Sequence, residues 1–317
     1  MSRKRGKSIS NSFKVGDVTV RVSADPPHLL KNIRNALQKS DFVLSEETVE
    51  KYKLKSNIVS LEHIRKLYEF DLARELKYAP KLTDECFDVT GLNRMNVPLA
   101  KRLLSQEVGA GLKALVENFD YPPEYLTTAF FCTYIGKWYN LITSRSSSFA
   151  FSLHNFRKYE EEMEFLDEMI DIIDSAKLSA SQGYERIPIQ KGFILSTISL
   201  KEIVDFLLRH RGYKYVMCGR FTGDCIENFF SCVRRHQKAP TCLIFETIIK
   251  ILTIISHLRP SKHGSYEEDE TDESDDVNPW LKEVKDFEEE EQSEAEKEAA
   301  EMEVSTLSLF FYRTYIW

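Results

Sequence analysis

The sequence of 317 residues is poor in the residues that interrupt regular structure, with only 12 glycines and 10 prolines. That scarcity excludes collagen-like and loop-rich chains. The six cysteines form no paired framework, which favours a reducing compartment over a disulfide-stapled secreted protein. The longest apolar stretch, residues 242–258, is short and contains charged side chains. Because a bilayer span needs about 20 apolar residues, we expect no membrane partner.

The signature loops of nucleotide-binding and zinc-binding proteins are also missing. The sequence has no Gly-x-x-x-x-Gly-Lys-Ser/Thr loop, no Gly-x-Gly-x-x-Gly loop and no Cys-x-x-Cys pair. Cys218, Cys225 and Cys232 recur every seven residues, which is not a zinc spacing and favours small core residues. No single local motif therefore names the chemistry of the chain.

Charge is present in abundance but is unevenly distributed. The whole chain carries a net charge of −7, whereas residues 267–303 contain 19 acidic residues and 3 lysines, so the remainder carries +9. Such an acidic composition predicts a disordered tail over residues 261–317. The basic remainder permits a polyanionic partner such as DNA.

Near the amino end, alternating valines predict a strand over residues 17–23. Asp25 follows at the carboxyl end of this strand, and the two prolines after it suit the first turn of a helix over residues 28–38. Asp25 then has two interpretations. It either caps the helix, as aspartate commonly does, or contributes an oxygen ligand to a metal site.

Helical periodicity dominates the rest of the chain. Amphipathic stretches occupy residues 58–78, 97–119, 124–142 and 159–176, and further helices are predicted over 224–235 and 242–257. In the helix over 224–235, the apolar face comprises Ile226, Phe229, Phe230 and Val233. Glu227 lies away from that face, one turn after Asp224. This acidic pair is either solvated surface or part of a cation site.

Three ordered segments carry a likeness to a known family. They are residues 24–35 (Ala-Asp-Pro-Pro-His-Leu-Leu-Lys-Asn-Ile-Arg-Asn), residues 79–83 followed by 95–100, and residues 222–230 followed by Arg234. Over about residues 15–258 the chain resembles the P element-type transposases, which include relatives with a zinc-binding THAP domain.

The resemblance implies an α+β, predominantly helical fold in which a mostly α-helical insertion interrupts a partial ribonuclease H-like catalytic core. The domains it implies are a ribonuclease H-like segment (1–38), a GTP-binding-like insertion (39–205), a return to the core with the Glu227 helix (206–260) and the disordered acidic tail (261–317).

In that family three acidic residues bind Mg²⁺; the second resembles Asp25 and the third resembles Glu227. The first lies upstream of the matched segment, and the zinc-binding DNA-recognition domain has no counterpart here. We therefore expect an N-terminally truncated chain, in which the strand over 17–23 lacks its sheet neighbours and has unpaired edges.

The resemblance also implies a GTP site. Residues that match the family's nucleotide contacts are Lys81, Val97, Tyr139 and Asp224, whereas Asn96, Asn140 and Thr143 stand where the family has Lys, Asp and Asn. A carboxylate accepts both donors on the N1 and N2 edge of guanine, but the amide of Asn140 offers one acceptor and an unwanted donor. Since an unmade buried hydrogen bond costs about 1–3 kcal/mol, reduced guanine selectivity is expected.

The sequence thus predicts a nuclear chain related to enzymes that perform Mg²⁺-dependent, GTP-assisted DNA cleavage and strand transfer. We expect it to be catalytically incomplete, with DNA and a second copy or a full-length transposase as partners. The alternative is a non-catalytic regulator that binds DNA or a transposase.

Overall fold

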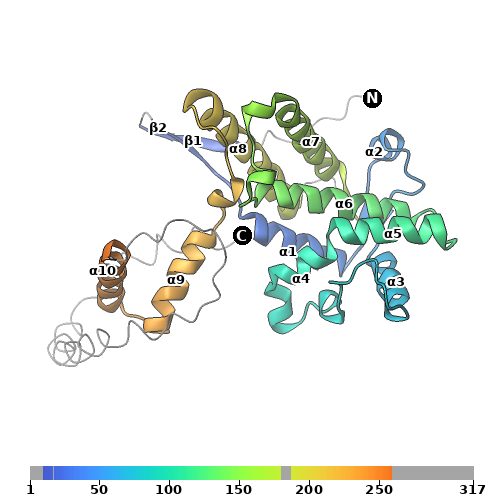
Figure 1. The fold of residues 1–317 in the computed structure, drawn as a ribbon, viewed down its shortest axis with the longest axis horizontal. Coiled ribbons are helices and arrows are strands. Elements are labelled where there is room, and N and C mark those ends of the chain that lie inside the picture. The colour runs from blue at the N-terminus through green and yellow to red at the C-terminus, as the bar shows by residue number, and fades with distance from the viewer. Residues whose placement is uncertain (1–9, 17, 180–186, 259–317) are drawn as a thin grey trace. The chain divides into compact units, whose positions relative to one another are not determined.

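The computed structural model describes residues 10–16, 18–179 and 187–258 (Figure 1). The predicted acidic tail over 261–317 lies outside the described residues. The chain divides into two units, residues 1–231 and residues 232–317.

The first unit is mostly helical, and its helices are α1 (Pro26–Leu37), α2 (Glu46–Lys51), α3 (Leu61–Leu72), α4 (Val97–Leu103), α5 (Gln106–Asn118), α6 (Tyr125–Ile142), α7 (Phe156–Ser175) and α8 (Pro188–His210). Short 3-10 helices are η1 (Asp84–Phe87), η2 (Gly91–Met95), η3 (Ser147–Phe149), η4 (Leu153–Asn155) and η5 (Cys218–Phe221). The strands are β1 (Ser12–Val15), β2 (Val18–Arg21), β3 (Phe42–Val43), β4 (Ile58–Val59) and β5 (Lys177–Leu178).

Helix α9 (Asp224–His236) runs across the boundary between the two units, and α10 (Cys242–Leu258) belongs to the second. Both helices occur where the apolar periodicity predicts them. Among the described residues, no helix combines the length and the apolar character that a bilayer span requires.

The predicted strand over 17–23 forms as β2, but the expectation that it lacks sheet neighbours is wrong for one of its edges. β1 pairs with it in an antiparallel hairpin, with Phe13 opposite Val20. Gly16 adopts a positive φ of 60° in the tight turn, which a residue with a Cβ rarely does. A second small sheet has the strand order β4-β3-β5. These short strands do not by themselves establish a ribonuclease H-like core.

Serine caps divide stretches that periodicity alone predicts as continuous. The stretch over 97–119 forms two helices, because the Ser105 hydroxyl accepts a hydrogen bond from the Val108 N–H at 3.2 Å and begins α5. The stretch over 58–78 likewise begins as β4, after which Ser60 caps α3. A serine side chain competes with the backbone for its own hydrogen bonds, so it favours a new helix start over continuation.

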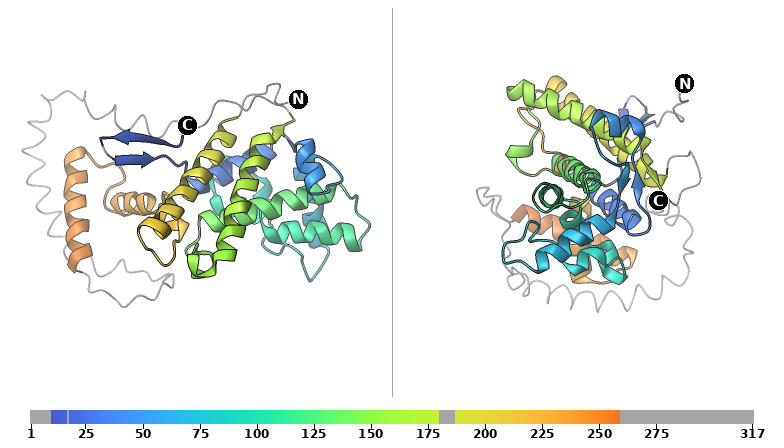
Figure 2. Two further views of the ribbon diagram at one scale, coloured as in Figure 1. Left: turned by 90° about the horizontal axis from the view of Figure 1, so that it is seen from above. Right: turned by 90° about the vertical axis from the view of Figure 1, so that its right-hand side faces the viewer.

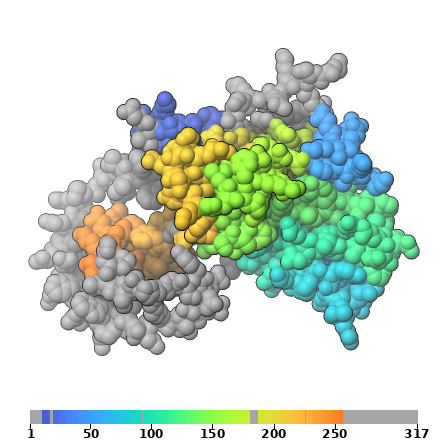
Figure 3. Space-filling view, turned by 45° about the horizontal axis from the view of Figure 1, so that its top comes forward, coloured from blue at the N-terminus to red at the C-terminus, as the bar shows by residue number. Residues whose placement is uncertain are grey.

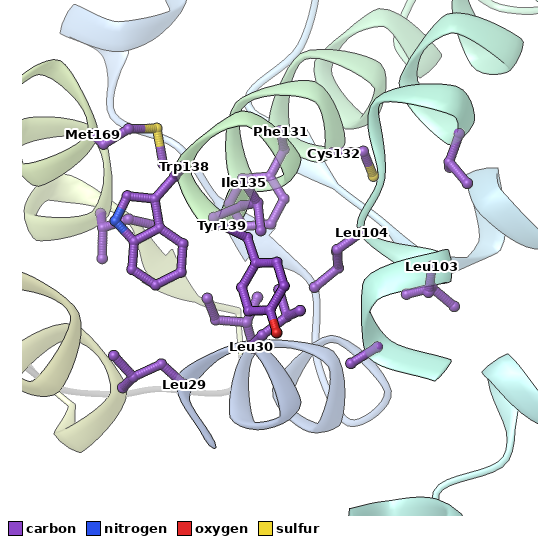
Figure 4. Packing of buried hydrophobic residues seen from close by; sticks show 14 of the residues in the cluster. Leu29, Leu30, Leu103, Leu104, Phe131, Cys132, Ile135, Trp138, Tyr139 and Met169 are labelled. Atoms are coloured by element: carbon purple, nitrogen blue, oxygen red, sulfur yellow. The ribbon is translucent and has the colours of Figure 1, made fainter. Parts of the chain in front are cut away.

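Helix α6 lies against both α1 and α8. The ring of Trp138 is fully buried and stacks on Phe193 of α8 with ring centroids 4.0 Å apart. Its indole N–H donates a hydrogen bond to the Thr197 hydroxyl at 3.0 Å. Figure 4 shows Trp138 and Tyr139 pointing toward α1, with Leu30 beneath them. This apolar contact holds α1 against the two longer helices.

Helices α7 and α8 lie side by side and form one face of the first unit (Figures 2 and 3). The buried Gln190 joins them, because its amide donates hydrogen bonds to the carbonyl oxygens of Ile173 and Ala176, both at 2.7 Å. Its side-chain oxygen accepts the Ile187 N–H at 2.9 Å. One side chain therefore satisfies unpaired backbone groups at the end of α7 and at the start of α8.

Helices α5 and α6 are also neighbours (Figure 1), and glycine permits their close approach. A Cβ on Gly109 would lie 2.7 Å from the carbonyl oxygen of Ala129 and would also collide with the Thr133 hydroxyl. On α6, a Cβ on Gly136 would lie 3.0 Å from the backbone nitrogen of Gln106. The backbones of the two helices therefore approach too closely for larger residues at these positions.

We expect Gly109→Ala to destabilise the protein by about 1–3 kcal/mol, the usual cost of overpacking. Helix propensity alone predicts the opposite sign, a gain of about 1 kcal/mol. Chemical denaturation monitored by circular dichroism measures the difference. Ala110→Ser, at the exposed neighbouring position on α5, serves as the control and should change stability by about 0.5 kcal/mol or less. A stabilised Gly109→Ala variant would contradict the proposed close contact.

Candidate carboxylate and nucleotide site

Asp25 lies between β2 and α1, as the sequence predicts, and it caps α1. One carboxylate oxygen accepts the His28 backbone N–H at 3.4 Å. The other accepts the backbone N–H of Gly223 at 2.8 Å, from 198 residues later in the chain. The capping interpretation is therefore right, and the same carboxylate also fastens the start of α9 to the start of α1.

Glu227 lies in the first turn of α9, and its side chain is 63% exposed. Its carboxylate lies 3.4 Å from Nε2 of His28, and the same nitrogen lies 3.8 Å from the Asp25 carboxylate. The structure therefore brings the two sequence-distant carboxylates to a single imidazole, which lies within contact distance of both.

Lys31 adds a positive charge next to this pair. It lies on α1 one turn after His28 and is buried. Burial lowers the pKa of the Lys31 ammonium group, whereas the negative charges of Glu227 and Asp25 act in the opposite direction. Two basic residues of α1, His28 and Lys31, thus lie next to the carboxylates of Asp25 and of Glu227 on α9.

The described residues fit a magnesium ion only in part. Asp25 and Glu227 supply the oxygen ligands that a hard cation prefers, but a two-metal site needs further bridging carboxylates. Among residues 10–16, 18–179 and 187–258, no group of three or more His, Cys, Asp or Glu side chains is arranged to hold a metal. We therefore assign no cleavage step to these residues.

Backbone pairing joins the segment that follows α8 to the segment that follows α6. Phe151 and Val216 exchange two backbone hydrogen bonds, at 3.0 and 2.8 Å. Further along, the N–H of Gly219 donates to the carbonyl oxygen of Ser144 at 2.9 Å. A Cβ on Gly219 would lie only 2.7 Å from that oxygen. These backbone hydrogen bonds between residues 144–151 and residues 216–219, called the zipper below, position the loop that contains Gly223. They therefore also position the start of α9.

Three of the sequence-predicted nucleotide residues lie near the end of α6. Tyr139 is buried, and burial, together with the negative charges of Asp224 and Asp25, raises its pKa to about 12. The Thr143 hydroxyl donates a hydrogen bond to the Tyr139 carbonyl oxygen at 2.6 Å. Asp224 forms an ion pair with Arg145. The end of α6 and the starts of α1 and α9 therefore share one charged region.

The residues predicted to contact phosphates lie on neighbouring elements. The Lys81 ammonium is exposed and pairs with the Glu107 carboxylate at 3.5 Å. Asn96 caps α4 by accepting the Leu99 N–H at 3.3 Å, and the half-buried Val97 is the first residue of that helix. No hydrogen bond or ion pair connects Lys81 with the Tyr139 region in the described part of the chain.

One cation does connect α4 with Tyr139. The ammonium of Lys101, on α4, lies 6.0 Å from the centre of the Tyr139 ring. Asn140, the next residue of α6, is half-buried.

Ile226 departs from its predicted burial, since 55% of its surface is exposed. The amphipathic pattern of α9 therefore does not identify a buried face at that position.

Sequence reasoning did not foresee the contacts of the residues that join the site. It gave His28 a capping or core role and treated Lys31, Lys101 and Arg145 as dispersed basic residues, whereas the structure places His28 between the two carboxylates and pairs Arg145 with Asp224. His28 and Lys31 could have been found by their spacing, because residues three apart share a helix face. The contacts of Arg145 and Gly223 depend on the zipper between two distant segments. No local pattern in the sequence reports such a contact.

Comparisons with known proteins identify related sequences and a related fold. Residues 27–151 match the family described as a TNP-like, GTP-binding insertion domain. The Transposable element P transposase of Drosophila melanogaster is 25% identical over 218 residues, which cover 67% of this chain. The chain is a relative of the P element-type transposases. The resemblance drawn from its three ordered segments is confirmed.

The fold of this transposase relative is also similar to a solved one, the Drosophila P element transposase strand transfer complex. The TM-score is 0.65 at 20% identity, and the match covers 79% of this chain and 56% of that one. The chain spans only 27% of the length of the curated Drosophila relative. The likeness therefore supports the family and the fold, and it leaves the activity of this chain to be tested.

We expect Asp25→Ala to lower stability by about 1–2 kcal/mol, because it removes a helix cap and leaves the Gly223 N–H without its acceptor. Asp25→Asn keeps one oxygen acceptor, which can serve the N–H of His28 or that of Gly223 but not both, so it should lose less stability than Asp25→Ala and still be weaker than the native chain. Urea denaturation of the two variants measures the difference. Equal losses in both would contradict the capping role.

Proposed function

We propose that the chain contains the nucleotide-binding part and two carboxylates of a P element-type transposase, and that it acts on DNA in the nucleus. The observation that carries the proposal is the meeting of Asp25 and Glu227 at His28, in the same region as Tyr139 and Asp224. Asp25 and Glu227 would be two of the Mg²⁺ ligands. The proposed nucleotide contacts are Lys81, Asn96, Val97, Tyr139, Asn140, Thr143 and Asp224.

The match of residues 27–151 to a GTP-binding insertion domain supports the nucleotide part of the proposal. The residues present fit a nucleotide in part, because Lys101 and Arg145 offer cations close to Tyr139. A bound guanine nucleotide would supply phosphates for such cations and a base for the polar side chains near the end of α6.

A surface for DNA phosphates is suggested by exposed basic side chains on η2 and α4. Arg94, Lys101 and Arg102 are exposed, and none forms an ion pair with the described residues. No acidic residue occurs between positions 89 and 105. Because such charges are not neutralised locally, they can replace the counterions of a polyanion.

We expect the chain alone to bind duplex DNA and not to cleave it, because a two-metal site needs more carboxylates than Asp25 and Glu227, which meet at His28. The substrate would be duplex DNA with the terminal repeats of a P-type element, incubated with Mg²⁺ or Mn²⁺. Robust cleavage that Glu227→Ala abolishes would contradict the inactivity. Binding without cleavage also fits the alternative role, a regulator that binds DNA or a second transposase chain.

Mobility shifts test the basic surface. The double variant Arg94→Gln and Arg102→Gln should weaken DNA binding and reduce the salt slope by about 2 if each arginine contacts one phosphate. Arg157→Gln is the matched control, since Arg157 is 90% exposed but pairs with Glu161 at 2.9 Å. An equal loss in the control would show a nonspecific effect of charge.

Guanine selectivity can be tested at a single position. We expect Asn140→Asp to increase the preference for GTP over ATP by about 5- to 150-fold, which corresponds to about 1–3 kcal/mol for restored hydrogen bonds to guanine. Isothermal calorimetry with both nucleotides measures the ratio. Asn140→Ala is the control that removes the amide without adding an acceptor. If Asn140→Asp and Asn140→Ala give the same ratio, the side chain does not contact the base.

A further inference from the structure

The loop that follows α6 is fixed at both ends and exposed between them. Ser144 is held by Gly219, and Phe151 is held by Val216, through the backbone hydrogen bonds of the zipper. The intervening residues 145–149 are all exposed. The loop is therefore accessible to another macromolecule while its position next to α9 is defined.

Three consecutive serines occupy this loop, and their hydroxyl groups differ in availability. The hydroxyls of Ser146 and Ser148 lie 2.8 Å apart, and that of Ser146 also accepts the Ser148 N–H at 3.3 Å. In the described structure, the hydroxyl of Ser147 makes no hydrogen bond. Ser147 therefore presents the most available nucleophilic oxygen of the three.

Two cations flank Ser147. Arg145 precedes it by two residues, and its guanidinium is 58% exposed and paired with Asp224. On the other side, the ammonium of Lys158 donates a hydrogen bond to the carbonyl oxygen of Ser148 at 2.7 Å. An added phosphate carries a charge of about −1.5 to −2, and such charges form strong hydrogen bonds with arginine and lysine.

We propose that Ser147 is a phosphorylation site, and that its phosphate draws Arg145 away from Asp224 at the start of α9. A serine kinase that selects an arginine two residues before its target is the enzyme class that fits. The Ser147 oxygen forms a bond to the γ-phosphorus of ATP, the bond to ADP breaks, and the hydroxyl proton passes to a base of the kinase.

The consequence for nucleotide binding rests on the proposed function. Asp224 is one of the proposed nucleotide contacts, and its charge is now neutralised by Arg145. Phosphorylation adds negative charge in this region and releases the Asp224 carboxylate. Since a nucleotide is itself an anion, its affinity should fall.

The experiment uses the full chain, incubated with an arginine-directed serine kinase and Mg-ATP. Mass spectrometry should locate one phosphate on Ser147, and Ser147→Ala should abolish it. Phosphate that appears only at other residues would overturn the site. Ser152, whose hydroxyl donates to the Lys214 carbonyl oxygen at 2.7 Å, is an internal control that should stay unmodified.

The effect on Arg145 is measured without any nucleotide. Phosphorylation should lower the melting temperature by about 2–4 °C if it costs about 1 kcal/mol at the start of α9. In Asp224→Asn, which keeps the kinase's arginine but lacks the ion pair, phosphorylation should give no such decrease. An equal decrease in both proteins would overturn the proposed exchange of partners.

Calorimetry with GTP then tests the link to the proposed function, and we expect about tenfold weaker binding after phosphorylation. Unchanged GTP affinity would overturn the regulatory consequence. If neither form binds GTP, the nucleotide part of the proposed function fails, while the mass-spectrometric and thermal results still decide the modification site.

Discussion

The Asp25 carboxylate accepts two backbone N–H groups, one from the start of α1 and one from Gly223, just before α9. The rest of the candidate site depends on this interaction. With Gly223 held at 2.8 Å, the first turn of α9 projects Glu227 toward His28, and Asp224 toward Arg145. A Cβ on Gly223 would lie 3.3 Å from the carboxylate, so glycine also provides the room for this approach.

A rigid support lies behind this contact. Helix α1 is packed against α6 and α8 through buried side chains such as Trp138 and Phe193. The hydroxyl of Ser196, on α8, donates a hydrogen bond to the Ala24 carbonyl oxygen at 2.7 Å and holds the junction that precedes Asp25.

A hollow of about 480 Å³ lies next to residues 37–41, at the other end of α1. Because α1 has 12 residues, its two ends are about 18 Å apart. The carboxylate pair is therefore distinct from that hollow.

The charged side chains of the candidate site have oppositely charged neighbours within the chain. His28 and Lys31 face the carboxylates from α1, and Arg145 faces Asp224 from the loop after α6. A cation or an anionic ligand that enters this region must compete with these internal partners. Ligand affinity in this region therefore depends on how strongly the existing ion pairs are held. A change of one charge can make these side chains exchange partners.

The positions of most helices could be predicted, because a 3.6-residue apolar period reports directly on which side of a helix is buried. The stretches over 124–142 and 159–176 agree closely with α6 and α7. The break at Ser105 was missed because serine also occurs on the exposed surface of a continuous helix. A serine in the sequence therefore does not by itself show that a new helix begins there. Strand β1 was missed although Phe13 and Val15 alternate with Ser12 and Lys14, because the residues before position 17 are mostly basic and polar.

The sequence by itself determined that Asp25 follows a strand and begins a helix, that Glu227 lies in the first turn of another, and that the chain resembles one transposase family. Only the tertiary structure decided that these two carboxylates share His28, that Lys31 is buried beside them and that Arg145 pairs with Asp224. The physical reason is distance along the chain. A helix or a cap is stabilised by residues within about four positions, whereas the Gly223 contact requires the packing and backbone pairing of everything between residues 25 and 223.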